Sequence, residues 1–449
     1  MKRFNLHLIT AVVSLALFSL VLGQEKWNEY RGRKGKALEY REVESREQGE
    51  EVGEIAMGKR SQKMKGDIRY SVIRERTGEG SFQNREIRFY DEKQNVTFTK
   101  SLTNRTLRMR SDQGQYVIIQ TLIKEAEGQS EHYKMQYELF NSRGRLLWTK
   151  YQPVHNEGMD NIYYISDCDG SVVEVNDYEG SLIFYNPGGD TIKVVDLFET
   201  IELSLGNRII DCKFTIDGQY LVAGITDAKG EIFSSKSGII LFDRWGTERW
   251  KFQADESMAY RIYLSPDSRY ILSYHRNRRI AEGKKDAMYL LNMNGTLIKR
   301  YPETSAVAIF STDGKYALMN TGLHFELLET ETGEILNVQN VQGGLQRVTS
   351  GPKVIYDADI SSEMKLIGIV KAEERYVDVV EDGYESVKVE MVNPEIEVYH
   401  FNGVLAWSKP FLDQNIFGYK LGFSFEDEGR EILTRVGNNI KKYRLVNPE

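Results

Sequence analysis

Short apolar or alternating segments recur along the chain, and each is followed by a polar turn and a second apolar segment. The stretch "STDGKYALMN" at residues 311–320 has this form, with "AVAIFS" leading into its turn. Alternation with a period of two is typical of β-strands, and Asp and Gly suit a tight connection between two strands. Each unit is therefore predicted to be a β-hairpin. A Ser or Thr opens the turn at positions 111, 166, 215, 265, 311, 361 and 424.

A second hairpin follows most of these units, as in "IILFDRWGTERW" and "MYLLNMNGTLIKRY", where a turn with Gly joins two β-rich segments. Two hairpins make four strands, and the repeat recurs about every 46 to 63 residues, which is the period of a propeller blade. The sequence predicts an all-β propeller with seven four-stranded blades, and eight blades are the open alternative. Strands near the two ends of the chain, within residues 84–101 and 419–445, are expected to close the ring.

The turns carry aspartates whose role has two interpretations. Asp217, Asp267 and Asp313 each lie two residues after the Ser or Thr that opens the turn. Asp side chains in such positions hydrogen-bond to nearby backbone groups. We expect these three residues to hold the turn rather than to bind a ligand or take part in catalysis.

The first residues predict export. Lys2 and Arg3 precede an apolar stretch from Leu8 to Leu22, and the small Gly23 and polar Gln24 follow. This order is typical of a secretory signal peptide at residues 1–23, cleaved after Gly23, so a secreted or periplasmic location is expected. An uncleaved anchor is the alternative, but the apolar run is shorter than the roughly 20 residues of a spanning helix. No stable membrane anchor is expected after cleavage.

Domain boundaries follow from composition. Residues 24–65 are dense in mixed charge and poor in apolar residues, which predicts a charged tail that is disordered or a marginal helix. Residues 66–449 are expected to form the propeller as one closed unit, and a monomer is expected.

Net charge limits the partners. Loss of residues 1–23 removes two positive charges and no carboxylates, so the formal net charge moves from −7 to −9. Binding along a nucleic-acid backbone needs a concentrated basic surface. We therefore expect no nucleic acid among the partners, and a protein or a glycan is the expected ligand.

The chain has two cysteines, Cys168 and Cys212. An oxidising compartment would permit a disulfide between them, and two buried free thiols are the alternative. Their separation in sequence lacks the close spacing of a zinc site, so no metal is expected.

The turn phrases, above all "SPDSRYIL" from Ser265, resemble the repeats of bacterial extracytoplasmic propellers related to TolB. The outer hairpins that contain Trp148, Trp250 and Trp407 are similar to WD-repeat and quinoprotein-type blades. The resemblance covers most of residues 84–447. It implies the fold and says little about activity, because such blades serve scaffolds, sensors and enzymes alike.

No catalytic motif accompanies the repeat. The Gly-x-Ser-x-Gly turn of the propeller-linked hydrolases is absent, the six histidines form no ligand pair, and the cysteines do not form a quinoprotein-type cluster. We therefore expect no cofactor and assign no catalytic residue. The alternative is an extracytoplasmic hydrolase or lyase that acts on polysaccharide at the mouth of the central channel, because carboxylates from separate blades could meet there.

Four long insertions fall between the second and third strands of predicted blades, beginning at Gln120, Gly224, Ser273 and Val370. Loops on a rigid scaffold commonly carry recognition residues, so this loop-rich face is the predicted protein- or glycan-binding face. One sector of it is expected to be basic and another acidic. The candidate binding residues are Tyr274, His275, Arg276, Arg278, Arg279, Lys284, Lys285, Glu373, Glu374 and Asp378.

Overall fold

The protein is described from a computed structural model. The structure describes residues 40–47, 52–56, 70–76, 82–91, 95–102, 106–112, 114–127, 130–153, 162–176, 180–197, 207–227, 237–256, 258–277, 286–302, 307–320, 324–340, 353–381, 384–411, 415–417, 421–436 and 439–446. The predicted signal peptide, residues 1–23, lies outside these ranges.

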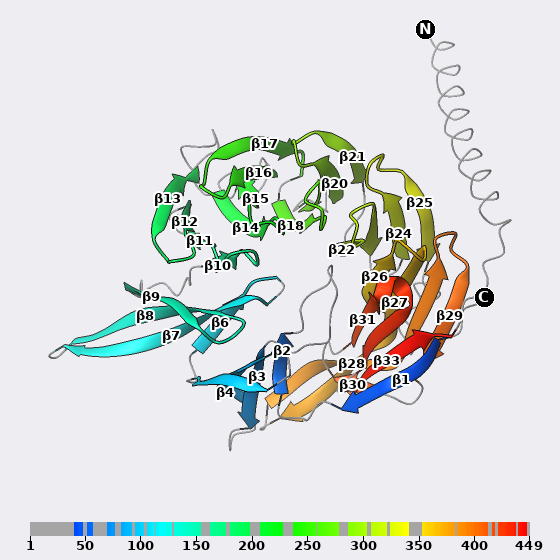
Figure 1. Ribbon diagram of the computed structural model, residues 1–449, viewed down its shortest axis with the longest axis horizontal. Coiled ribbons are helices and arrows are strands. Elements are labelled where there is room, and N and C mark those ends of the chain that lie inside the picture. The colour runs from blue at the N-terminus through cyan, green and yellow to red at the C-terminus, as the bar shows by residue number, and fades with distance from the viewer. Residues whose placement is uncertain are drawn as a thin grey trace, which may run out of the picture.

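Eight antiparallel sheets are present among the described residues, and Figure 1 shows them following one another around a central axis. Seven sheets have four strands, and the remaining sheet has four strands with a short fifth strand added. The innermost strands contact one another in chain order from the second sheet to the last. The predicted all-β propeller is confirmed, and eight sheets match the larger of the two blade numbers that the sequence left open.

We number the sheets as blades in chain order, with strands given from the axis outward. Blade 1 consists of β2 (Val52–Ala56), β3 (Tyr70–Arg76), β4 (Phe82–Tyr90) and β5 (Val96–Ser101), and blade 2 consists of β6 (Thr106–Arg110), β7 (Tyr116–Glu127), β8 (Ser130–Asn141) and β9 (Leu146–Pro153). Blade 3 consists of β10 (Ile162–Ile165), β11 (Val172–Asn176), β12 (Ser181–Tyr185) and β13 (Thr191–Asp196). Blade 4 consists of β14 (Asn207–Phe214), β15 (Tyr220–Asp227), β16 (Ser237–Asp243) and β17 (Glu248–Ala254).

Blade 5 consists of β18 (Met258–Leu264), β19 (Tyr270–Arg276), β20 (Ala287–Asn292) and β21 (Leu297–Pro302), and blade 6 consists of β22 (Val307–Phe310), β23 (Tyr316–Asn320), β24 (His324–Glu329) and β25 (Ile335–Asn340). Blade 7 consists of β26 (Lys353–Ser361), β27 (Leu366–Glu381), β28 (Tyr384–His400) and β29 (Leu405–Pro410), with β30 (Asn415–Phe417) added to β28. Blade 8 consists of β31 (Leu421–Glu426), β32 (Glu431–Val436), β33 (Asn439–Leu445) and β1 (Tyr40–Glu47). A 3₁₀ turn (Asp427–Gly429) joins β31 to β32.

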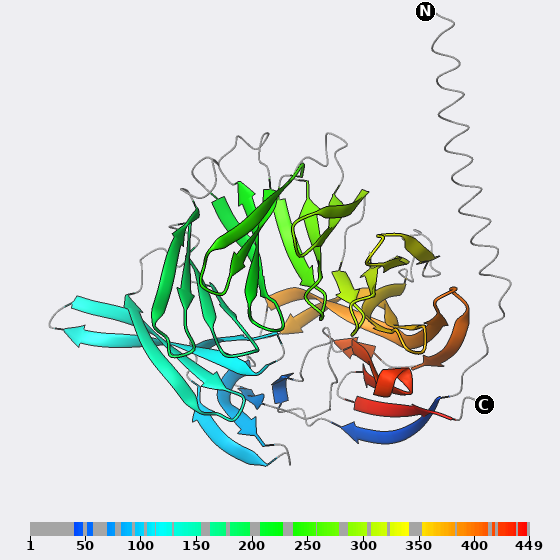
Figure 2. The same cartoon turned by 45° about the horizontal axis from the view of Figure 1, so that its top comes forward.

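Blade 8 takes strands from both ends of the propeller. β1 pairs antiparallel with β33, from Tyr40 opposite Leu445 to Glu47 opposite Asn439. Figures 1 and 2 show the blue β1 beside the red C-terminal strands. Closure by the two ends is therefore observed, but the N-terminal strand is β1 and not the segment 84–101, whose strands β4 and β5 belong to blade 1.

The prediction for residues 24–65 was wrong where the structure describes them, because β1 and β2 are strands of the propeller. The dense charge of "YREVESRE" pointed to a tail. An outermost strand, however, needs little apolar surface, since it lies farthest from the core and is held by a backbone ladder on one edge. The outermost strands β13 and β21 show the same rule, because most of their residues are exposed.

The second strand of a blade is buried between the neighbouring sheets, whereas the outermost strand alternates. Six consecutive residues of β19 are buried, from Tyr270 to His275, but β17 alternates between half-buried and exposed positions as far as Ala254. Apolar clusters fill the spaces between consecutive blades, as where Phe184 of blade 3 meets Phe242 of blade 4 edge to face. The core is therefore a set of layers between sheets.

The repeated turn phrase joins the first and second strands of a blade. In blade 6 the Ser311 hydroxyl donates to Asp313 Oδ1 at 2.8 Å and accepts the backbone N–H of Tyr316 at 3.0 Å. Thr215 and Ser265 make the same two kinds of bond in blades 4 and 5. The predicted turn role of Asp217, Asp267 and Asp313 is confirmed.

The outer hairpins explain the recurrent tryptophans. Gly189 in blade 3 has φ +87°, and a Cβ there would lie 2.7 Å from the Trp148 ring of blade 2. Gly295 of blade 5 has φ +84° and stands against Trp250 of blade 4 in the same way. Glycine is needed at both places for its backbone conformation and for the close approach of the indole. Each tryptophan thus packs beneath the turn of the next blade.

Antiparallel connections divide the ring into two faces. Turns between the first and second strands and between the third and fourth strands lie on one face, which we call the turn face. Connections between the second and third strands lie on the other, which we call the ribbon face. The predicted insertions at Gln120, Gly224, Ser273 and Val370 all fall at the ribbon face.

Candidate functional site

Two insertions on the ribbon face are regular β-ribbons rather than loops. β7 and β8 pair continuously from Tyr116 opposite Asn141 to Glu127 opposite Ser130. β6 pairs with β7 only as far as Thr121, and β9 pairs with β8 only from Lys134 onward. The ends of β7 and β8 therefore extend past the rest of blade 2, and Figure 1 shows them projecting outward from the ring.

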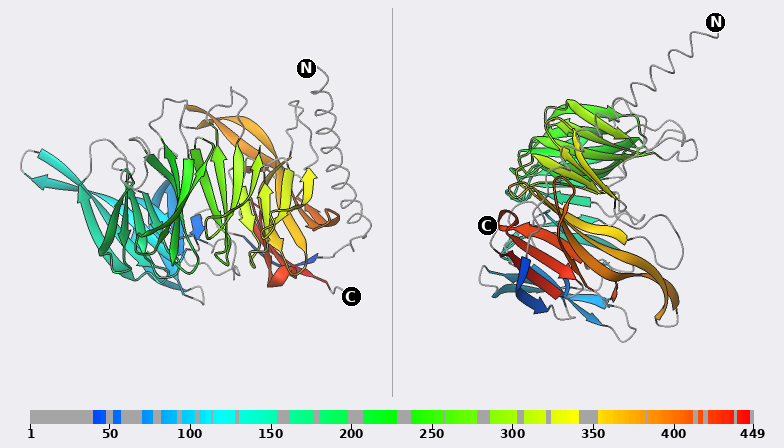
Figure 3. Two further views of the ribbon diagram at one scale, coloured as in Figure 1. Left: turned by 90° about the horizontal axis from the view of Figure 1, so that it is seen from above. Right: turned by 90° about the vertical axis from the view of Figure 1, so that its right-hand side faces the viewer.

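Blade 7 carries the second ribbon. β27 and β28 pair as far as Glu381 opposite Tyr384, whereas β26 reaches only Glu373 and β29 only Glu395. Figure 3 shows this orange ribbon rising above the strands beside it. Within the described residues, the two strands of each ribbon pair only with each other along most of the part that extends past the blade. Of the other two insertions, which begin at Gly224 and Ser273, residues 228–236 and 278–285 lie outside the described residues.

Aromatic side chains are exposed on the ribbons. Tyr376 of β27 is 69% exposed and Tyr133 of β8 is 36% exposed. Tyr376 donates a long hydrogen bond of 3.5 Å to Glu374, whose other oxygen accepts the Tyr356 hydroxyl at 2.8 Å. Tyrosine on an exposed surface offers a large contact area and a polar group at its tip, which suits a protein interface.

The predicted basic patch was wrong for its first two residues. Tyr274 is 6% exposed, and its hydroxyl donates to Asp286 at 2.5 Å. His275 is fully buried between Ser237 Oγ, 2.6 Å from Nδ1, and Ser273 Oγ, 2.7 Å from Nε2. β19 continues through both residues as a second strand, which the neighbouring blades cover on both faces. Neither side chain can meet a partner.

The remaining candidates are divided. Arg276 is half-buried at the end of β19, with its guanidinium 5.1 Å from the centre of the Tyr260 ring. Glu373 and Glu374 are half-buried on β27, and Asp378 lies farther along the same strand. Arg278, Arg279, Lys284 and Lys285 lie outside the described residues. The structure thus places the acidic candidates on the β27–β28 ribbon.

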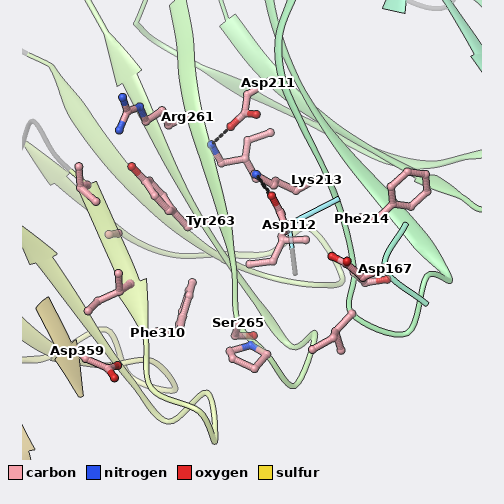
Figure 4. A pocket seen from close by; sticks show the side chains of 18 of the residues that line it. Asp112, Asp167, Asp211, Lys213, Phe214, Arg261, Tyr263, Ser265, Phe310 and Asp359 are labelled. Atoms are coloured by element: carbon pink, nitrogen blue, oxygen red, sulfur yellow. Dashed lines mark hydrogen bonds and ion pairs between the residues drawn. The ribbon is translucent and has the colours of Figure 1, made fainter. Parts of the chain in front are cut away.

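A cavity of about 570 Å³ lies at the centre of the ring, lined by the innermost strands and turns of blades 2 to 7. Figure 4 shows its charged residues facing one another from different blades. Apolar side chains such as Phe214 and Ile309 make much of the wall. The charged residues are Asp112, Asp167, Asp211, Lys213, Arg261 and Asp359.

The charged groups of the cavity have protein partners. Lys213 Nζ of β14 bonds to Asp112 Oδ1 at 2.8 Å, across the blades. Asp211 Oδ2 accepts the backbone N–H of Ile262 in blade 5 at 2.9 Å. Arg261 is hydrogen-bonded to Tyr263, which raises the pKa of the arginine. The first contact joins blades 2 and 4, the second joins blades 4 and 5, and the third lies within blade 5.

Burial raises the pKa of the Asp211 carboxyl, although Lys213 and the Ile262 N–H oppose the shift. For Lys213 burial acts to lower the pKa, but Asp112 and Asp211 outweigh burial and the pKa is raised. A carboxyl with a raised pKa in a cavity is a candidate acid. The same kind of contact recurs at blade 7, where Asp359 Oδ2 accepts the Phe425 N–H at 2.8 Å and Asp357 Oδ2 accepts the Phe423 N–H at 3.1 Å.

This recurrence favours a structural role for Asp211. Carboxylates on the innermost strands of two different blades hold the backbone of the blade that follows. No histidine lines the described part of the cavity. Among the described residues, no group of three or more His, Cys, Asp or Glu side chains is arranged to hold a metal ion.

Both cysteines are free thiols. Cys212 is fully buried in β14, and burial raises its pKa. Cys168 lies in the turn after β10 and is exposed. The structure therefore has two free thiols, as in the second of the alternatives that the sequence left open, but only one of them is buried.

No known protein family matches the sequence, and no curated protein matches it. The fold is similar to those of solved propellers. The propeller of Dos1 matches with a TM-score of 0.47 and 11% identity over 84% of this chain and 89% of that chain. The C-terminal WD40 domain of Sif2 matches with a TM-score of 0.49 and 12% identity over 92% and 100%.

A eukaryotic initiation factor also matches, with a TM-score of 0.42 and 11% identity over 75% of this chain and 86% of that chain. Identities this low concern the fold alone, and the propeller architecture rests on the eight sheets and their pairing. No helix within the described ranges is long and apolar enough to cross a membrane.

Proposed function

We propose that the protein is an interaction scaffold, a WD-repeat-like propeller that binds a partner protein through its ribbon face. We further propose a secreted or periplasmic location, supported by the N-terminal sequence, and a kinship with bacterial extracytoplasmic propellers of the TolB type, supported by the turn phrases.

The observation that carries the proposal is the pair of ribbons that outgrow their blades on one face. A two-stranded ribbon buries little apolar surface and is marginally stable alone in water. The ribbons extend past the other strands of their blades, and they present exposed tyrosines and long backbone edges. Surface that is costly for the fold but rich in contact groups is what a binding partner would use.

Site-specific photo-crosslinking tests the proposal. A photoreactive phenylalanine analogue at Tyr376 should give a defined adduct with one partner in the producing cells. The matched control is Trp245, which is 54% exposed on the turn face and should give none. Equal adducts at Tyr376 and Trp245 would contradict binding of a partner through the ribbon face. The absence of an adduct both when the analogue is placed at Tyr376 and when it is placed at Tyr133 would also contradict it.

The location has its own test. Mass spectrometry of the natively produced protein should find a mature chain that begins at Gln24. An intact chain that begins at Met1 in the cytoplasm would contradict export without affecting the scaffold proposal.

A polysaccharide hydrolase or lyase is the second candidate, and the raised pKa of Asp211 within a cavity of 570 Å³ is the observation that favours it. Asp112→Asn and Asp211→Asn should then abolish cleavage of a polysaccharide that the wild-type protein degrades. The scaffold proposal expects no cleavage by the wild-type protein in such a screen.

A further inference from the structure

The outer edge of β28 already accepts an added strand. β29 covers this edge from Tyr399 to Glu395. Farther toward the ribbon tip, β30 pairs with the same edge, with Asn415 opposite Val392 and Phe417 opposite Glu390. β30 is three residues long and follows the blade rather than belonging to its four-strand path. This edge of β28 therefore accepts an extended segment as an added strand.

The edge continues beyond β30. β28 remains paired with β27 on its other side from Val389 to Tyr384. In the part of the chain that the structure describes, no strand pairs with the outer edge of these six residues. An open edge offers a row of backbone N–H and C=O groups that a further strand can use.

The charge of the ribbon selects the kind of strand. Residues 373–389 contain six Asp or Glu residues and two Lys or Arg residues. Arg375 lies near Glu390 at 3.6 Å, so one of the two cations is already balanced within the ribbon. Residues 373–389 are net negative, so a second copy of this ribbon would meet net like charge, whereas a basic strand would meet opposite charge.

We propose that the edge of β28 from Tyr384 to Val389 binds an extended segment rich in Lys or Arg from a partner protein, as an added β-strand in line with β30. This inference rests on the scaffold function proposed above and names the chemistry of the partner. Backbone hydrogen bonds supply the pairing, and the acidic ribbon supplies selection for the basic segment and against self-association.

The test uses the full protein and synthetic octapeptides with blocked ends. An alternating Lys-Val peptide should bind, as measured by calorimetry in low salt, and an alternating Glu-Val peptide should bind at least about tenfold more weakly. A Lys-Val peptide that is N-methylated at alternate residues keeps its charge but cannot donate along one edge. The N-methylated peptide should also bind at least about tenfold more weakly than the unmodified Lys-Val peptide.

Hydrogen exchange locates the peptide. Amides in residues 384–389 should gain protection when the Lys-Val peptide is bound. Glu381→Lys combined with Glu385→Lys should weaken binding about tenfold or more. The matched control is Glu331→Lys with Glu334→Lys, two exposed glutamates near the β24–β25 turn on the turn face, which should leave binding within about twofold.

Binding without protection at 384–389, equal binding of the N-methylated peptide, or an unchanged affinity after charge reversal would overturn the inference. Association of the free protein into dimers that charge reversal abolishes would also overturn it. Crosslinking at Tyr376 separates the two proposals. A crosslinked partner without Lys-Val binding would overturn the edge inference and leave the scaffold function intact. If neither a crosslinked partner nor Lys-Val binding is found, both proposals are overturned.

Discussion

At the scale of single residues, hydroxyl groups hold the blade turns in register. In the turn phrases of blades 4, 5 and 6 a Ser or Thr hydroxyl accepts a backbone N–H five residues ahead and donates to the Asp two residues ahead. Those bonds fix the start of the second strand, which is the most buried strand of the blade. The polar turn and the apolar strand are therefore one structural unit.

Loss of one such hydroxyl should destabilise the protein measurably. Ser311 is buried, and Ser311→Ala leaves the N–H of Tyr316 without its side-chain acceptor. The expected loss is about 1–2 kcal/mol of unfolding free energy, measured by urea denaturation. The neighbouring exposed Thr312→Ala is the control and should change stability by less than about 0.5 kcal/mol. Equal losses from both variants would show that the hydroxyl has no special role.

His275 is a residue whose protonation state the fold fixes. Ser237 Oγ donates to the carbonyl of Glu256 at 2.8 Å, so it accepts from His275 Nδ1, and Ser273 Oγ donates to Nε2. This bonding pattern holds the neutral imidazole. Burial accordingly lowers the pKa of His275 to about 3.

That pKa predicts a dependence of stability on pH. Since the unfolded His pKa is about 6.5, the unfolded state binds the extra proton first as the pH falls. The contribution of His275 is complete above about pH 6.5 and should decline by about 1.4 kcal/mol per unit toward pH 3. His275→Gln should be less stable at pH 7.5, with a shallower decline between pH 6.5 and 4 in urea titrations. Parallel curves for the two proteins would refute the assignment.

At the scale of elements, carboxylates on the innermost strands bind the blade that follows. Asp357 is buried on β26, and its two oxygens accept the N–H groups of Ala358 and Phe423. Because β26 and β31 lie in different sheets, the bond from the Phe423 N–H fixes how blade 8 sits against blade 7.

Removal of the acceptor should weaken that junction. Asp357→Ala leaves the buried N–H of Phe423 unsatisfied and should cost about 1–3 kcal/mol, measured by denaturant unfolding. Asp357→Asn keeps one acceptor oxygen, so its loss of stability should be less than half of the loss caused by Asp357→Ala. If Asn proves as damaging as Ala, the negative charge rather than the hydrogen bond is the important property.

The sequence predicted much at this scale. The Ser/Thr-x-Asp-Gly phrase located the inner turns because turn chemistry is local and repeated. It did not show that the insertions after Gln120 and Val370 are ribbons, although alternating valines such as Val377 and Val379 were a usable signal. It also misassigned Tyr274 and His275, because burial of a second strand depends on neighbouring blades and not on local polarity.

At the scale of the whole molecule, ring closure depends on a strand that composition concealed. β1 covers the outer edge of β33 over the length of that strand. The charge of Tyr40–Glu47 resembles that of a disordered tail, and only long-range pairing shows its place. Without β1, blade 8 would keep three strands and an open edge.

Two N-terminal deletions test this closure. Removal of residues 1–47 eliminates β1 and should lower stability by several kcal/mol, at roughly 0.5–1.5 kcal/mol for each ladder hydrogen bond lost. It should also promote self-association through the exposed β33 edge, seen by light scattering. Removal of residues 1–39 is the control and should leave the melting temperature and the mass in solution unchanged. Equal stability of the two truncated proteins would exclude β1 as the closing strand.

Closure by β1 also sets the order of events during synthesis. Tyr40 leaves the ribosome early, but its partner Leu445 is made about 400 residues later, so this pairing carries a large loop-closure entropy. Blades 1 to 7 are each complete in local sequence and can form during translation, whereas blade 8 must wait. For most of the synthesis time β1 is therefore a strand without its partner. A chaperone or a neighbouring nascent chain has that interval in which to bind it.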